Sequence, residues 1–190
     1  MTGQAAAALL REVGALMDGH FRLNSGRHSP VYVEKFRLLQ HPQHTERLCR
    51  LIADRFRSER PELVTGPTTG GIILSYEVAR LLGLRGIFAE KSAAGRAFQR
   101  GFQVRPGERT LIVDDVLTTG GSIREVIEAV RRAEGAPIGV GVLVDRSGEY
   151  GRSMLRPFGL PLFACVELDL PTYEEGACPL CDAGVPLTVT

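Results

Sequence analysis

From residue 63 to residue 144 the chain alternates between two kinds of apolar pattern, and this alternation limits the possible folds more than any other feature. Short apolar runs of strand length lie at 63–65, 86–88, 110–113 and 138–144. Between them, apolar residues recur at helical spacing. They are Leu74, Val78, Leu81 and Leu82 in one interval and Ile123, Val126, Ile127 and Val130 in another. Such alternation predicts an α/β fold, in which helices flank a mostly parallel twisted sheet.

Less regular segments surround this alternation. We expect an N-terminal helix with one apolar face, formed by Leu9, Val13, Leu16 and Met17. A second helix is predicted over 42–59, and residues 21–33 between the two predict an extended, turn-rich segment. Residues 90–107 lack a regular apolar pattern and predict a loop or a mobile hairpin. Beyond Pro157 the pattern is short and broken by proline, so only a strand near 162–166 is expected.

Composition narrows the class of protein. The chain has 190 residues, of which 44% are apolar and 24% charged, with a formal net charge of +1. This is the size and composition of one globular domain over residues 1–190. The near-zero charge argues against a general nucleic-acid or membrane-surface binder. No apolar run approaches the roughly 20 residues of a bilayer span, and no secretion signal opens the chain, so we expect a cytoplasmic protein.

The segment 111–123 carries most of the chemical information. An apolar strand ends in Asp114 and Asp115, and the loop Thr118-Thr119-Gly120-Gly121-Ser122 leads into a helix. Ligands of open α/β sheets bind at the carboxyl ends of the strands, where backbone N–H groups and the helix N-terminus attract a phosphate. The carboxylates are placed to accept hydrogen bonds from sugar hydroxyls. No P-loop or GxGxxG motif is present, and the ordinary alternative is a helix capped by Ser122.

This block resembles the phosphoribosyl pyrophosphate (PRPP) signature of the type I phosphoribosyltransferases. The resemblance implies that Asp114 and Asp115 hold the ribose hydroxyls and act in catalysis. It also implies that the 5′-phosphate lies in the loop that follows. The implied PRPP-binding residues are Asp114, Asp115, Val116, Leu117, Thr118, Thr119, Gly120, Gly121 and Ser122.

Three further segments resemble the orotate phosphoribosyltransferases within that family. Residues 21–32 are similar to the hood segment that closes over the base, so a small hood is expected from about 1–40 with part of the C-terminal tail. Arg146 follows the strand after the signature helix, where the family binds the orotate carboxylate, with Thr118 beside it. A planar guanidinium suits a carboxylate. Residues 66–72, with Thr69, resemble the pyrophosphate-binding loop.

The resemblance implies transfer of ribose 5-phosphate from PRPP to orotate, which yields orotidine 5′-phosphate and pyrophosphate in pyrimidine synthesis. Magnesium would be held mainly by substrate oxygens and waters, with no direct protein ligand. The family also implies a homodimer with shared active sites. Two alternatives stay open: a purine phosphoribosyltransferase, which Arg146 and the hood segment oppose, and a PRPP-sensing regulator that binds nucleic acid, which the low net charge opposes.

The cations that bind pyrophosphate are less clear from the sequence. Asn24 and Gly70 stand where lysines are common in the family. Lysine is scarce, since Lys35 and Lys91 are the only two beside 21 arginines. Lys91 keeps a family-like place at the start of the expected mobile loop, and we expect it to assist catalysis there. Lys91 and Arg96 are therefore candidates for pyrophosphate contact.

Cys178-Pro179-Leu180-Cys181 is the one Cys-x-x-Cys motif in the chain. A structural zinc needs four ligands, and this pair supplies two. Cys49 and Cys165 lie in apolar segments, where a free thiol packs as a small hydrophobe. The histidines are far away along the sequence; they are His20, His28, His41 and His44. The sequence thus favours a plain structural turn, with a zinc shared between two subunits and a reversible disulfide as alternatives.

Overall fold

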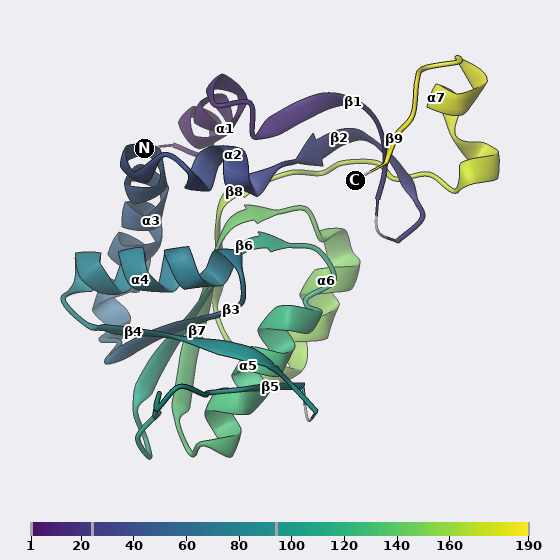
Figure 1. The fold of residues 1–190 in the computed structure, drawn as a ribbon. Helices are drawn as coiled ribbons and strands as arrows, with labels where there is room; N and C mark the ends of the chain where they lie inside the picture. Colours follow the sequence, from purple (N-terminus) through teal and green to yellow (C-terminus); the bar gives the residue numbers. More distant parts are fainter. Residues whose placement is uncertain (1, 24, 94, 190) are drawn as a thin grey trace.

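The structure is a computed structural model that describes residues 2–23, 25–93 and 95–189. Its main sheet has six strands in the order β5-β4-β3-β6-β7-β8 (Figure 1). The strands are β3 (Leu63–Pro67), β4 (Arg85–Ser92), β5 (Gly95–Ala97), β6 (Arg109–Leu117), β7 (Ala136–Asp145) and β8 (Leu162–Glu167). All neighbours are parallel except β4 and β5, which form an antiparallel hairpin. The predicted mostly parallel α/β fold is confirmed.

Helices cover both faces of this sheet. One face carries α1 (Gly3–Glu12), α2 (Lys35–Leu39), α3 (Pro42–Phe56) and α4 (Gly70–Leu82). The other carries α5 (Gly121–Arg132) and α6 (Gly148–Leu155). The alternation of side chains along β6 divides the core between the faces: Leu111 and Val113 pack on the first, Ile112 on the second. The central strands are apolar because both of their faces are buried.

A second, smaller sheet lies beyond the main one and joins the two ends of the chain. Its strand order is β2-β1-β9, with β1 (Leu16–Arg22), β2 (His28–Val33) and β9 (Thr188–Val189). β1 and β2 form an antiparallel hairpin, and β9 from the C-terminal tail pairs with β1 in parallel. The short helix α7 (Pro179–Asp182) lies beside the far end of this hairpin, away from the main sheet (Figure 1).

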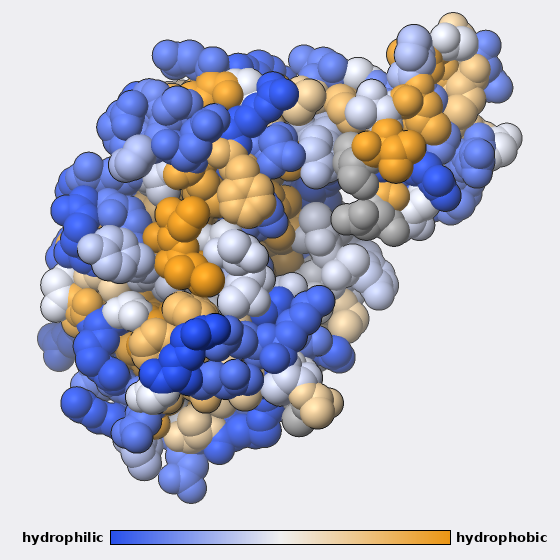
Figure 2. All heavy atoms as spheres, in the orientation of Figure 1, coloured by the Kyte–Doolittle hydropathy of each residue, from blue (hydrophilic) through white to orange (hydrophobic). Residues whose placement is uncertain are grey.

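The face shown in Figure 2 is mostly hydrophilic, but apolar side chains gather in a few places. One of these lies over α4, where Ile73 and Tyr76 are exposed, and a second lies at the end that carries α7 and β9. Exposed Val185, Leu187 and Val189 belong to the second. None of the helices in the described part of the chain is long and apolar enough to cross a membrane.

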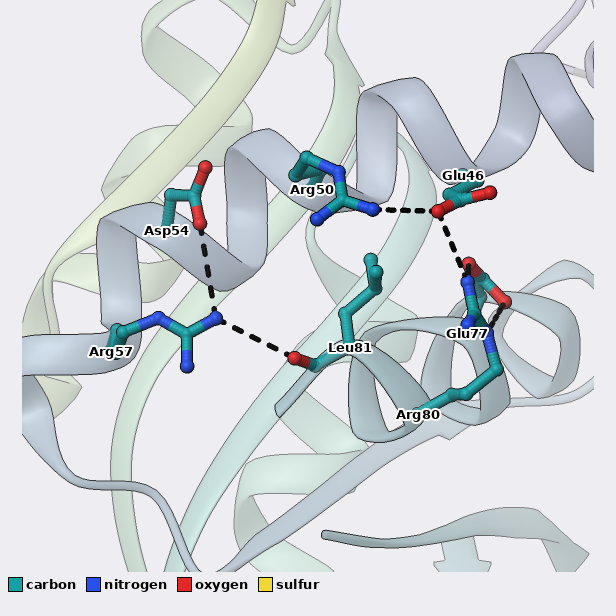
Figure 3. A network of polar contacts seen from close by, with 7 residues as sticks. All are labelled: Glu46, Arg50, Asp54, Arg57, Glu77, Arg80 and Leu81. Atoms are coloured by element: carbon teal, nitrogen blue, oxygen red, sulfur yellow. Dashed lines mark hydrogen bonds and ion pairs between the residues drawn. The ribbon is translucent and has the colours of Figure 1, made fainter. Parts of the chain in front are cut away.

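An ion-pair network joins α3 to α4 at the surface (Figure 3). Glu46 accepts a hydrogen bond from Arg50 at 2.6 Å, and its Oε1 lies 3.2 Å from a guanidinium nitrogen of Arg80. The hydrogen bond from Arg50, followed by the contacts with Arg80, holds the pKa of Glu46 below its usual value. Such exposed pairs contribute little stability. The buried contacts beneath them, between residues such as Leu48 and Leu74, hold the two helices together.

Two details differ from the sequence-based expectation. Leu16 and Met17 do not extend the N-terminal helix, which ends at Glu12, but open β1. Gly14 has a positive φ of 69°, and Ala15 N–H donates to the Leu10 carbonyl, a geometry that terminates helices. Helical spacing alone cannot reveal such a stop. The sequence also did not predict α2, α6, α7 or β9.

Candidate active site

The site lies where the chain changes its direction of progress across the sheet. From β3 the chain proceeds outward to β4, and from β6 it proceeds the other way to β7 and β8. Ligands of open α/β sheets bind at such a switch point, beyond the carboxyl ends of the two central strands. Here these ends carry residues 67–69 and 114–119, and both segments line a cavity of about 800 Å³.

The small sheet forms the opposite wall of this cavity. This wall consists of Leu23, Ser25, Arg27 and Tyr32 from the β1–β2 hairpin, together with Thr172 from the tail. The remaining lining residues are Val33, Glu34, Lys35, Phe36, Pro67, Thr68, Thr69, Asp114, Asp115, Val116, Thr118, Thr119, Ser122, Arg146, Ser147 and Tyr150. Asn24, which the sequence placed at a family lysine position, lies outside the described residues.

Asp114 and Asp115 lie at the floor of the cavity and are both buried. The Asp115 amide donates to Asp114 Oδ1 at 2.9 Å, and the Val116 amide donates to Asp115 Oδ1 at 2.6 Å. Burial, and next the charge of Asp115, raise the pKa of Asp114 above its usual value. Lys35 Nζ lies 3.0 Å from Asp115 Oδ2 and balances one of the two charges. The pair therefore offers closely spaced acceptors for hydroxyl groups.

The loop after β6 is open at its tip and packed at its base. Thr118, Thr119 and Ser122 are exposed and line the cavity. Gly120 has a φ of 78°, and a Cβ there would lie 3.0 Å from the Gly151 carbonyl oxygen, so glycine suits this position. Gly120 is the N-cap of α5 and makes no side-chain hydrogen bond. The alternative in which Ser122 merely caps the helix is therefore wrong.

Three of the predicted PRPP-binding residues do not line the cavity themselves. Leu117 is buried in the core, and Gly120 and Gly121 are not among the lining residues. The backbone N–H groups in the first turn of α5 have no partner within the helix, and the positive end of the helix dipole lies at the same end of the helix. The loop and this helix end together form an anion-binding surface.

Arg146 contributes a cation to the same cavity. Its backbone N–H donates to the Leu117 carbonyl at 3.0 Å, which fixes it beside the loop 118–122. Partial burial lowers the pKa of its guanidinium below the usual value. Within the described residues, no carboxylate forms an ion pair with this guanidinium. Its neighbour Asp145 is held instead by Arg152, at 2.8 Å. A half-buried guanidinium without a protein counter-ion is suited to bind an anionic ligand.

The turn between β3 and α4 forms another wall. Pro67, Thr68 and Thr69 line the cavity, and the peptide bond between the two threonines is cis. Arg96, which is buried, donates from Nη1 to Thr68 Oγ1 at 3.0 Å and lies 3.4 Å from Glu125. Arg96 thus supports this turn without lining the cavity.

The segment 90–107 partly forms the β4–β5 hairpin, in which Lys91 pairs with Arg96 along the backbone. Lys91 is exposed and does not line the cavity. Ala93 is exposed as well, and Ala94, part of the expected mobile loop, lies outside the described residues. A role of Lys91 and Arg96 in pyrophosphate contact stays a prediction.

Sequence reasoning missed several residues of the site. Lys35 is the most informative, because it contacts Asp115 from a segment 80 positions earlier. Tyr32, Phe36 and Tyr150 also line the cavity. A signal for Lys35 did exist: in a chain with only two lysines, each is a candidate for a special position. Nothing in the local pattern connected it to the acidic pair.

The donor set at this site can also be tested for a magnesium ion. Among the described residues, no group of three or more ligand side chains meets in this cavity, since the one such group lies in the small sheet and tail. Two adjacent carboxylates fit a hard cation that takes most of its oxygen ligands from substrate and water. The residues present therefore fit magnesium that arrives with a phosphorylated ligand.

Comparison with known proteins agrees with this geometry. The phosphoribosyl transferase domain family matches residues 37–155, and fold and site define a type I phosphoribosyltransferase. Orotate phosphoribosyltransferase of Pelotomaculum thermopropionicum is 48% identical over 98% of this chain and 95% of its own. A protein of that name from Thermus thermophilus is 46% identical over 94% of this chain and 96% of its own. The chain belongs to the orotate phosphoribosyltransferase family.

Solved structures agree. The crystal structure of orotate phosphoribosyltransferase from Aeropyrum pernix superposes with a TM-score of 0.72 at 31% identity, over 85% of this chain and 93% of that chain. An adenine phosphoribosyltransferase from Thermoanaerobacter pseudethanolicus superposes with a TM-score of 0.62 at 19% identity, over 73% of this chain and 88% of that chain. That second likeness concerns the fold alone, so the fold does not identify the acceptor base.

Proposed function

We propose that this protein transfers ribose 5-phosphate from PRPP to orotate, which yields orotidine 5′-phosphate and pyrophosphate for pyrimidine synthesis. The observation that carries the proposal is that Arg146, with no carboxylate partner among the described residues, lines the cavity that holds Asp114 and Asp115. Orotate carries a carboxylate for that guanidinium, whereas adenine and hypoxanthine carry none. The high identity to orotate phosphoribosyltransferases supports the same acceptor.

The residues of the cavity divide the work between the two substrates. Asp114 and Asp115 accept hydrogen bonds from the ribose hydroxyls, and the loop with Thr118, Thr119 and Ser122 binds the 5′-phosphate. Arg146 holds the orotate carboxylate so that the ring nitrogen faces the anomeric carbon. Bond formation to that nitrogen and loss of pyrophosphate need positioning and electrostatic stabilisation more than a dedicated base. Magnesium, when bound with PRPP, neutralises charge on the leaving pyrophosphate.

Thr69 and its neighbours at the start of α4 are placed for the pyrophosphate group. This turn follows β3, the strand paired with β6, and it brings backbone groups and two hydroxyls to the cavity. Lys35 adds a positive charge beside the acidic pair. Together these groups surround the leaving group, while the hairpin of the small sheet excludes water from the opposite side.

We also propose a homodimer in which the β4–β5 hairpin serves the partner's active site. Lys91 is exposed on this hairpin and does not line its own subunit's cavity, which supports action on a second copy. α4 exposes Ile73 and Tyr76, and Phe36 is exposed on α2, which packs against α4. Such apolar surface on a globular domain is typical of an interface.

The proposal is tested by pyrophosphate release from PRPP and magnesium with orotate, uracil or hypoxanthine as acceptor. Of the three bases, only orotate should support rapid pyrophosphate release. Asp115→Ala should strongly raise the PRPP concentration needed for half-maximal rate, with the circular dichroism of the fold unchanged. A preference for hypoxanthine would make the protein a purine enzyme. If none of the three bases supports pyrophosphate release, or if the PRPP kinetics of Asp115→Ala are unchanged, the proposal is contradicted.

A further inference from the structure

Four side chains that can bind a metal meet where the C-terminal tail crosses the small sheet. They are His20 on β1, His28 at the start of β2, Cys178 just before α7 and Cys181 within α7. One ligand atom from each lies within 4.8 Å of the other three. His20, His28 and Cys178 are buried, and Cys181 is exposed. The cavity of the active site is lined by none of these residues.

The spacing of the ligand atoms matches a tetrahedral zinc site. Cys178 Sγ lies 3.5 Å and Cys181 Sγ 3.8 Å from His20 Nε2, and Cys181 Sγ lies 3.3 Å from His28 Nδ1. Ordinary Zn–S and Zn–N bond lengths at tetrahedral angles place sulfur about 3.6 Å from nitrogen. The two histidine nitrogens are 2.9 Å apart, against about 3.3 Å for an ideal pair. A shift of a few tenths of an ångström accommodates the ion.

His20 is already oriented as a metal ligand. Its Nδ1 lies 2.8 Å from the Val185 carbonyl oxygen. Because a carbonyl only accepts hydrogen bonds, Nδ1 carries the proton, and Nε2 presents a lone pair to the two sulfurs and to His28. A hydrogen bond from the second ring nitrogen is the usual means by which proteins fix the ring of a zinc-binding histidine. Here the acceptor belongs to the same tail that supplies both cysteines.

His28 completes the set from the other strand. Its side-chain polar contacts in the described part of the chain are with His20 and Cys181, both members of the cluster. Its backbone also links the two segments, since His28 N–H donates to the Tyr173 carbonyl at 2.8 Å. The hairpin therefore contributes two nitrogens and the tail two sulfurs.

The tail itself has little apolar packing to keep it folded. Between residues 174 and 189, Cys178 is the one side chain that is buried. Besides the pairing of β9 with β1 and the contacts of His20 and His28, the tail has polar contacts with Arg27, which donates to Thr172 and pairs with the exposed Glu174. Segments without a hydrophobic core of their own are usually stabilised by a metal or a disulfide. Both cysteines of the pair are free thiols in this structure.

We propose that His20, His28, Cys178 and Cys181 bind one zinc ion per chain, in a closed structural site that fastens the C-terminal tail to the β1–β2 hairpin. The sequence favours a plain turn because the cysteine pair gives two ligands, and His20 and His28 are far from the pair along the chain. Folding brings them to the pair. Two donors from each segment make four, which is a complete structural zinc site without a partner subunit.

The test is elemental analysis of the untagged full-length protein, purified without chelator from cells grown with zinc. The expected content is one zinc per chain. His28→Ala and Cys181→Ser should each lower it at least tenfold. Cys165→Ser is the matched control, because it removes another thiol, and its hydroxyl can still donate to the Leu48 carbonyl as the Cys165 thiol does. This control should retain its zinc.

Cobalt provides a second readout that does not depend on the variants folding well. The wild-type protein stripped of zinc and loaded with Co²⁺ should show the intense visible bands of tetrahedral cobalt, together with thiolate-to-metal charge transfer. One zinc per two chains would instead indicate a site shared between subunits and would overturn the proposal. So would octahedral cobalt bands, zinc that Cys181→Ser retains, or a Cys178–Cys181 disulfide found by mass spectrometry in freshly purified protein.

Discussion

Gly70 leaves the space that the carboxylate of Asp115 occupies. A Cβ placed on Gly70 would overlap Oδ2 of Asp115, closer than any two non-bonded atoms approach. On its other side, this oxygen is paired with Lys35 at 3.0 Å. A lysine at position 70, common in the family, would thus displace Asp115. In this chain the positive charge beside the acidic pair comes from Lys35, the first residue of α2.

Gly70→Ala should therefore act on PRPP. The added methyl group displaces the Asp115 carboxylate from the position in which it accepts ribose hydroxyls, so we expect KM for PRPP to rise severalfold. Gly3→Ala is a matched control, because Gly3 also opens a helix and its Cβ would meet only the Cys165 carbonyl oxygen at 3.6 Å. Steady-state kinetics of both variants make the comparison. Equal KM values in the two variants would show that Asp115 moves freely.

Arg146→Ala should weaken orotate more than PRPP. A hydrogen bond to a charged group contributes roughly 1.5–3 kcal/mol, and about 1.4 kcal/mol corresponds to tenfold in affinity. We therefore expect KM for orotate to rise about tenfold or more, and the preference for orotate over uracil to fall. Arg146→Lys keeps the charge but not the planar guanidinium, so its KM for orotate should lie between those of the wild type and Arg146→Ala. An equal effect on both substrates would make Arg146 structural.

Asp114→Asn should stabilise the folded protein at high pH. Burial and the charge of Asp115 raise the pKa of Asp114 in the fold, against the nearby positive charges of Lys35 and Arg96. The folded state then holds this proton more tightly than the unfolded state, so stability falls as pH rises through the folded pKa. Asparagine keeps the shape and removes the charge.

The measurement is thermal unfolding of both proteins across a range of pH. The variant should have a Tm a few degrees higher at about pH 8, and the difference should vanish near about pH 4, where the unfolded carboxyl is itself protonated. Activity should fall because an acceptor for ribose is lost. The exposed Asp169→Asn serves as control and should show no such trend. A Tm gain that does not depend on pH would contradict the explanation.

Mixed dimers should reveal whether the hairpin acts on the partner subunit. At a PRPP concentration near the wild-type KM, Lys91→Ala and Asp115→Ala are each expected to show little activity. After subunit exchange in an equal mixture, half of the dimers carry one of each, and one of their two sites is intact if Lys91 serves the partner. Activity should return to about a quarter of wild type. A mixture of Asp114→Ala with Asp115→Ala cannot recover, and no recovery in the first mixture would place Lys91 in its own subunit's site.

The predictable parts of this protein are those that depend on residues close together in the sequence. Leu111, Ile112 and Val113 identify a buried strand, and the acidic pair and the glycine-containing loop follow within about ten residues. The strand, the acidic pair at its end and the loop could therefore be predicted as one unit. No pattern in the sequence indicates which distant segments contact each other. Lys35 meets Asp115 across 80 positions, and Cys178 meets His20 across 158. Periodicity predicts which face of an element is buried, not which distant side chain it faces.

The parallel pairing of β9 with β1 has a consequence for the order of folding. All six strands of the main sheet lie within residues 63–167, so the floor of the cavity with Asp114 and Asp115 can form from one continuous stretch of the chain. The pairing of β9 with β1 instead joins Phe21 and Arg22 to Thr188 and Val189, and closing so long a loop costs more entropy than pairing neighbouring strands. During refolding, the floor of the cavity is therefore expected to form before the wall that the small sheet and the tail provide.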